Sequence, residues 1–143
     1  MRAPTHVQWL LALGSWTVFV WFQRIGNVIG DDDLSGFARI WRLVVAVGFV
    51  AAGMALVGCV VAGQRSVAGQ RGGGGAGLGR FASPLGVGLA AVGSTWWILR
   101  GGQILIGEWE LAFKAVHTVL AVVVVGLSVM VWRTRGYDRP LYG

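Results

Sequence analysis

Four long apolar segments, each close to the length that a membrane-spanning helix needs, are the feature that most constrains this sequence. They cover roughly residues 7–29, 38–62, 84–106 and 112–133. A bilayer is crossed by about 20 consecutive apolar residues in a helix, whereas a transmembrane barrel alternates apolar and polar positions. These segments are apolar on every face. The sequence therefore predicts an all-α integral membrane protein, a single membrane domain of four transmembrane helices.

The composition agrees with lipid as part of the solvent. Hydrophobic residues make up 55% of the 143 residues and charged residues 13%, against roughly 25% charged in an average soluble domain. This balance argues against a disordered tail and against a nucleic-acid-binding domain. The one cysteine, Cys59, makes neither an intramolecular disulfide nor a zinc site. We expect Cys59 to behave as a small buried hydrophobe.

The ends of the predicted helices are marked by proline, glycine and arginine. Pro84 suits the first turn of the third helix, and Gly63 suits the end of the second. Residues 63–83 are rich in glycine and arginine, which predicts a flexible loop. The first and third helices reach a full span only if they continue past Arg24 and Arg100, whose side chains can extend to the headgroups.

Basic residues are distributed unevenly over the predicted loops. The two ends of the chain and the central loop hold seven arginines against one acid, whereas the two short loops hold five basic and five acidic residues. By the positive-inside rule, both termini and the glycine-rich loop are predicted to be cytoplasmic. The first apolar segment has no signal-peptide cleavage pattern and is read as an uncleaved helix. Arginine-rich, lysine-poor usage indicates a bacterium of high genomic GC content, so we expect the bacterial cytoplasmic membrane.

The two halves of the chain resemble each other. Residues 21–37 and 97–113 share a pattern of Trp, two residues, Arg, then Gly with a carboxamide, an aliphatic pair, Gly, acids, Leu and Phe, with two one-residue gaps. Each pattern leads into a long apolar helix. This predicts two similar helical hairpins, a parallel internal repeat about an axis along the membrane normal.

Two sets of residues are candidates for function. A parallel repeat would gather the polar residues of both short loops into one outer cluster, which either anchors helix ends in headgroups or binds an anionic lipid, a quinone headgroup or a partner. This candidate cluster comprises Arg24, Asn27, Asp31, Asp32, Asp33, Arg39, Arg42, Arg100, Gln103, Glu108, Glu110, Lys114 and His117. Small residues that allow close helix packing, within the chain or between copies, are Gly48, Ala52, Ala55, Gly86, Ala90 and Ser94.

The sequence does not place residues as haem ligation, proton coupling or metal binding in a membrane protein would require. The two histidines, His6 and His117, fall on opposite predicted sides and do not clamp one haem. Every acid maps to a loop or tail, so no carboxylate within a helix is placed for proton coupling. Asp31, Asp32 and Asp33 point in different directions, so solvation is favoured over a metal ion.

We therefore expect no enzymatic activity, no catalytic or metal site and no cofactor. The favoured function is an accessory or scaffolding subunit in the lipid bilayer, which forms homo-oligomers or joins a larger membrane complex such as a respiratory or envelope assembly. The alternatives are a small anion channel or carrier that uses Arg24 and Arg100, and a lipid- or quinone-binding protein. Nucleic acid is not an expected partner.

Overall fold

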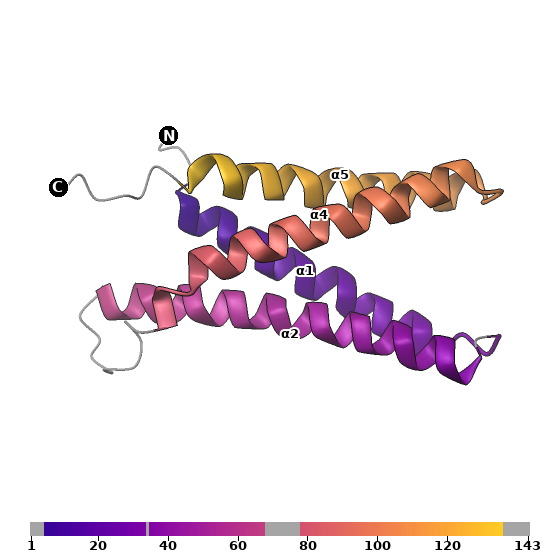
Figure 1. Cartoon of the computed structure of the whole chain (residues 1–143), viewed down its shortest axis with the longest axis horizontal. Helices are drawn as coiled ribbons and strands as arrows, with labels where there is room; N and C mark the ends of the chain where they lie inside the picture. The colour runs from indigo at the N-terminus through magenta and orange to yellow at the C-terminus, as the bar shows by residue number, and fades with distance from the viewer. Residues whose placement is uncertain (1–4, 34, 68–77, 136–143) are drawn as a thin grey trace. The chain divides into compact units, whose positions relative to one another are not determined.

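The computed structural model is all-helical and describes residues 5–33, 35–67 and 78–135. Its main helices are α1 (His6–Ile29), α2 (Gly36–Val67), α4 (Ala82–Ile106) and α5 (Leu111–Thr134) (Figure 1). Among the described residues, three stretches are long and apolar enough to cross a membrane: Gly36–Arg65, Ala82–Ile106 and Leu111–Thr134.

The first helix is long enough for a span but is not among these three stretches. It has 24 residues, as α5 does, and 24 residues of α-helix extend roughly 36 Å. Polar side chains such as Gln8, Thr17 and Gln23 interrupt its apolar sequence. The length and apolar composition that a membrane span requires are thus shown for α2, α4 and α5.

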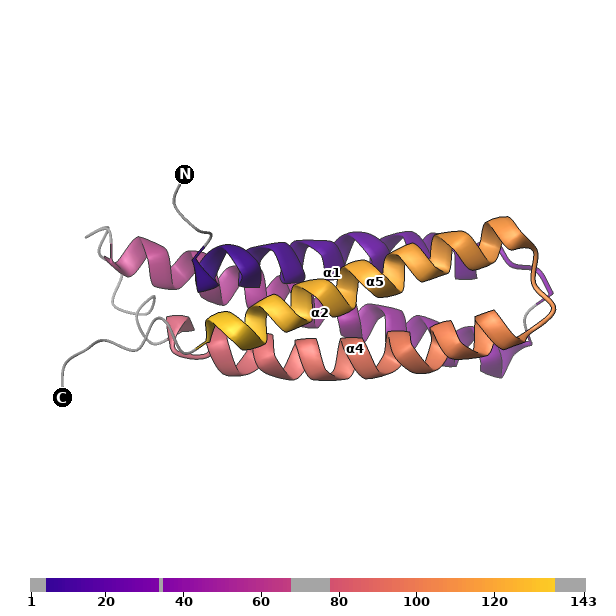
Figure 2. The same ribbon diagram turned by 90° about the horizontal axis from the view of Figure 1, so that it is seen from above.

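The helices divide into two compact units. One contains Gly14–Ala82, and the other contains the start of α1 up to Leu13 together with the chain from Ser83 onward. The first unit thus holds α2 with α1 from Gly14 onward, and the second holds α4 and α5 with the first residues of α1. We call the pairs α1–α2 and α4–α5 the first and second hairpins. Figure 2 shows, from above, how α4 passes through its turn into α5. We call the end with the short turn the turn end of each hairpin, and the other its open end.

In the first hairpin, α1 and α2 approach so closely that glycine is required. A Cβ atom built on Gly53 would lie 2.9 Å from the carbonyl oxygen of Gly14 and 2.9 Å from Cγ2 of Val18. Other buried residues of α2, Ala46, Leu56 and Val60, share this face at helical spacing. Lipid supplies no hydrophobic drive between helices, so van der Waals contact at small residues is what holds such a pair together.

The predicted end of the second helix at Gly63 is wrong, because α2 continues to Val67. Gly63 instead makes a close contact: a Cβ atom built on Gly79 would lie 2.8 Å from the Cα atom of Gly63. A glycine inside a helix costs only about 1 kcal/mol relative to alanine, which this contact offsets. The helical part 63–67 replaces the start of the predicted loop, and residues 68–77 of that loop lie outside the described ones.

In the second hairpin, α4 and α5 pack less tightly. A Cβ atom on Gly93 would lie 3.7 Å from Cγ1 of Val124, and one on Gly101 would lie 3.8 Å from Cβ of Ala121, both ordinary contacts. Pro84 lies in the first turn of α4, where its missing N–H needs no partner. Both α1 and α4 run without interruption past Arg24 and Arg100 to Ile29 and Ile106.

Candidate functional site

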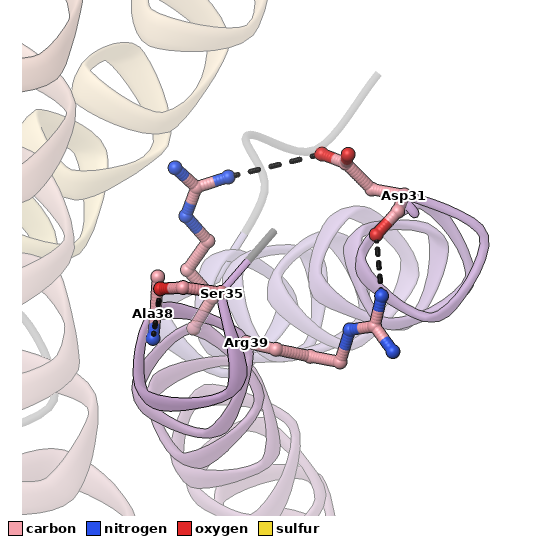
Figure 3. A network of polar contacts seen from close by, with 5 residues as sticks. Asp31, Ser35, Ala38 and Arg39 are labelled. Atoms are coloured by element: carbon pink, nitrogen blue, oxygen red, sulfur yellow. Dashed lines mark hydrogen bonds and ion pairs between the residues drawn. The ribbon is translucent and has the colours of Figure 1, made fainter. Parts of the chain in front are cut away.

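At the turn end of the first hairpin, Arg39 holds the end of α1. Its Nη2 donates a hydrogen bond of 2.7 Å to the backbone carbonyl of Asp31 (Figure 3). The Ser35 hydroxyl accepts from the backbone N–H of Ala38 at 3.4 Å, near the start of α2. The carboxylate of Asp31 forms an ion pair of 4.0 Å with Arg42. Polar contacts here therefore join the two helices across a short turn.

The other predicted residues of this turn lie at or near the surface. Asp32, Asp33 and Asn27 are exposed, and Arg24 is half-buried. The Nε atom of Arg39 is buried and has no hydrogen-bond partner among the described residues. Within those residues no group of three or more His, Cys, Asp and Glu side chains is arranged to hold a metal ion.

At the turn end of the second hairpin, Lys114 donates to a backbone carbonyl of the preceding helix end, as Arg39 does in the first. Its Nζ donates a hydrogen bond of 3.2 Å to the carbonyl of Leu105, near the end of α4. Lys114 is the fourth residue of α5, and Arg39 is the fourth residue of α2. Arg100 donates to Oε1 of Gln103 at 3.3 Å. The predicted acids Glu108 and Glu110 are exposed.

His117 belongs to a series of aromatic rings in the second hairpin. The centroid of its ring lies 4.0 Å from that of Phe113 and 6.3 Å from that of Trp97 on α4. Trp109 continues the series, with 5.0 Å between its centroid and that of Phe113. Nδ1 of His117 lies 2.9 Å from the carbonyl oxygen of Phe113. A carbonyl only accepts, so Nδ1 carries the hydrogen and Nε2 of the neutral ring is an acceptor.

The predicted polar cluster thus falls into two groups of contacts, one in each hairpin. Asp31, Arg39 and Arg42 are joined in the first, and Arg100 with Gln103 is joined in the second. Lys114 and His117 contact backbone carbonyls of their own hairpin. The structure places each group within its own hairpin.

The predicted packing residues divide by helix. On α2, Gly48 and Ala55 are exposed and Ala52 is half-buried, whereas on α4, Gly86 and Ala90 are buried and Ser94 is half-buried. The close approach in the first hairpin uses Gly14 and Gly53, which the spacing argument overlooked. Its only available signal was a glycine near the middle of each of two neighbouring apolar segments.

The sequence analysis also missed a polar junction around His6. The imidazole is 6% exposed. Its Nδ1 lies 2.9 Å from the hydroxyl of Thr134, and its Nε2 lies 3.4 Å from the hydroxyl of Ser83. Thr134 donates its own hydrogen to the carbonyl of Met130 at 2.7 Å, so it accepts from Nδ1–H. Three helix ends meet at this junction: the starts of α1 and α4 and the end of α5.

The two ends of each hairpin differ in their balance of acidic and basic residues. At the turn ends, acids match bases: three arginines and three aspartates in the first hairpin, and Arg100 with Lys114 against Glu108 and Glu110 in the second. Among the described residues, the open ends carry only basic charges. These are Arg65 and Arg80 in the first hairpin and Arg133 and Arg135 in the second.

No family model, curated protein or solved structure matches this chain.

Proposed function

We propose that the chain crosses the bacterial cytoplasmic membrane four times, with both termini and all open ends in the cytoplasm. The uneven charge of the hairpins supports this orientation, because basic residues are retained on the cytoplasmic side. The length of α1, 24 residues, is sufficient for a fourth span. Its hydrogen-bonding and charged residues include Arg24, close enough to the turn end for its guanidinium to reach the headgroups.

The two hairpins are proposed to be copies of one ancestral unit. In each, the fourth residue of the second helix is a base that donates to a carbonyl at or just beyond the end of the first helix. Trp21 and Trp97 begin the shared sequence pattern, and both are buried. A common origin accounts for the same device at both turns.

Within the membrane, we propose that the protein is a non-enzymatic scaffolding or accessory subunit that associates with itself or with a larger complex through α2. The observation that carries this proposal is an exposed row of small residues on that helix: Gly48, Ala51, Ala55 and Gly58. Cβ atoms built on Gly48 and Gly58 meet nothing within 4 Å. The helix therefore presents an unoccupied small-residue face.

The spacing of this face matches helix pairing. Steps of three, four and three residues keep the row on one side of the helix, roughly opposite the buried positions Ala46, Gly53 and Val60. Small residues in a row let a second helix approach until backbones are in contact, which is the main source of helix affinity in lipid. One face of α2 thus packs against α1, and the exposed face is left for a second helix.

Replacement of Gly48 and Ala55 by isoleucine tests this proposal. The double variant should lose oligomers in blue-native electrophoresis and site-directed crosslinking in membranes, because two branched side chains separate the backbones. The matched control is Gly126→Ile on α5, another exposed glycine with open space around its Cβ, which should leave the oligomers intact. Unchanged oligomers in the double variant, or their loss in the control alone, would refute this role of α2.

A further inference from the structure

The open end of the second hairpin combines exposed arginines with an exposed tryptophan. Arg133 and Arg135 are exposed where α5 ends at Thr134. Val129 and Trp132, at steps of three residues before Arg135, are 45% and 49% exposed. Residues three apart share a helix face, so an apolar strip leads directly to the guanidinium of Arg135.

The guanidinium of Arg135 is held by Trp132. Its Cζ atom lies 4.5 Å from the centroid of the indole ring, within the range of a cation–π interaction. The planar guanidinium has N–H groups around its edge that suit bidentate bonds to a phosphate. A tryptophan at the lipid–water interface also sets the depth of this group near the headgroups.

No carboxylate in the described part of the chain neutralises these two arginines. The ion pair between Asp31 and Arg42 lies at a turn end. Arg133 and Arg135 form no hydrogen bond through their side chains to a described residue. Within residues 5–33, 35–67 and 78–135, no acidic group takes up the charge of these two arginines.

The junction around His6 holds this helix end in place. Thr134 stands between the two arginines and accepts the hydrogen of Nδ1, and Nε2 of the same ring contacts Ser83 at the start of α4. The backbone N–H of Arg135 also bonds to the carbonyl of Val131 at 3.2 Å. The backbone that carries both arginines is thereby tied to two other helix starts, which reduces the ordering cost of binding.

From this arrangement we propose that Arg135 and Trp132 form a site for the phosphate of an anionic phospholipid in the cytoplasmic leaflet, with Arg133 adding positive charge from another side of the same turn. The proposal rests on the membrane orientation given above. The exposed strip of Val129 and Trp132 below the guanidinium favours a lipid over a soluble anion, since acyl chains cover that strip while the phosphate meets the arginines.

The test uses the full-length protein in nanodiscs of equal phosphatidylglycerol and phosphatidylcholine, released into native mass spectrometry. The R133Q/R135Q variant should retain roughly 25-fold less phosphatidylglycerol, since each basic residue near an anionic surface contributes a factor of about five. The matched control, R100Q/K114Q, removes two charges at the turn end of the same hairpin and should change retention less than about twofold. The milder R135K variant, which keeps the charge but loses the planar fork, should give an intermediate loss.

Three results would overturn this site. They are equal retention of both lipids, an equal loss in R133Q/R135Q and in the control, and displacement of phosphatidylglycerol by millimolar inorganic phosphate. Insertion and oligomeric state are measured in the same nanodiscs. A correctly inserted oligomer without selective lipid retention refutes the lipid site alone. A wild-type protein that fails to insert refutes the proposed function itself.

Discussion

The two hairpins use different means to hold their helices together. In α1–α2, the backbones meet at Gly14 and Gly53, where there is no room for a Cβ atom. In α4–α5, Gly93 and Gly101 make only ordinary contacts with the facing helix, and Trp97 and His117 contact each other across the pair. The two hairpins therefore have similar turn sequences but pack differently. The first depends on glycines that lack a side chain, and the second depends on bulky rings.

The largest effect is expected for Gly53→Val. A branched side chain would displace α1 from α2, because the obstructing atoms include the carbonyl oxygen of Gly14. Overpacking of this kind costs about 3 kcal/mol of unfolding free energy, measurable by denaturation in mixed micelles. Gly101→Val in the second hairpin should cost less than half as much. Equal losses at the two positions would show that the hairpins do not differ in this way.

In the second hairpin, His117→Ala should cost about 1–2 kcal/mol, because it removes ring contacts with Phe113 and Trp97. The measurement is the same denaturation, with indole fluorescence as a local probe of Trp97. Trp41, which corresponds to His117 in the proposed repeat, is 57% exposed, so Trp41→Ala is the matched change in the first hairpin. A larger loss for Trp41→Ala than for His117→Ala would reverse the comparison.

The junction at the open end gives a smaller prediction. His6→Ala should lower stability by about 1 kcal/mol, since it removes hydrogen bonds to Thr134 and Ser83. Faster hydrogen exchange should appear at the end of α5 and not at the turn ends. His6→Gln, which can still donate, should restore part of the loss. Gln8→Ala provides the control, because Gln8 is exposed and its side chain accepts from the nearby N–H of Thr5.

The smallest effect is expected for Arg42 at the first turn, in contrast to its neighbour Arg39. Arg42→Gln should change stability by less than about 0.5 kcal/mol, because its ion pair is long and its side chain is 43% exposed. Arg39→Gln should cost about 1–2 kcal/mol, since it removes a charge-assisted hydrogen bond to the carbonyl of Asp31. Denaturation at low and high salt separates them: only the Arg42 effect should disappear at high salt.

Much of the fold follows from composition and periodicity. Long apolar segments predict helices, and the first and third reach the length of a full span only by continuing past Arg24 and Arg100; α1 and α4 indeed extend past both. The predicted end of the second helix was wrong because a local sequence pattern does not distinguish between two structural roles of glycine. It can terminate a helix, or it can allow close contact, as Gly63 does with Gly79.

The sites were less predictable because they depend on contacts between distant residues. His6 and Thr134 are 128 positions apart, and the sequence around either residue does not predict their contact. The bases Arg39 and Lys114 were both among the predicted residues. Their shared bond to a carbonyl of the preceding helix end becomes visible only when each hairpin is folded. Charge balance, by contrast, is a property of composition and was available from the start.

The most direct test of the account is cysteine labelling of intact spheroplasts with a membrane-impermeant maleimide, in a Cys59→Ala background. Single cysteines replace Thr5, Ser35, Gln64 and Glu108, which are exposed near the ends of the four helices. Four spans with cytoplasmic open ends predict labelling at 35 and 108, and protection at 5 and 64 until the membrane is lysed. Labelling at 5 with protection at 64 would show that α1 does not cross the bilayer as proposed, and labels at 35 and 108 on opposite sides would contradict two parallel hairpins.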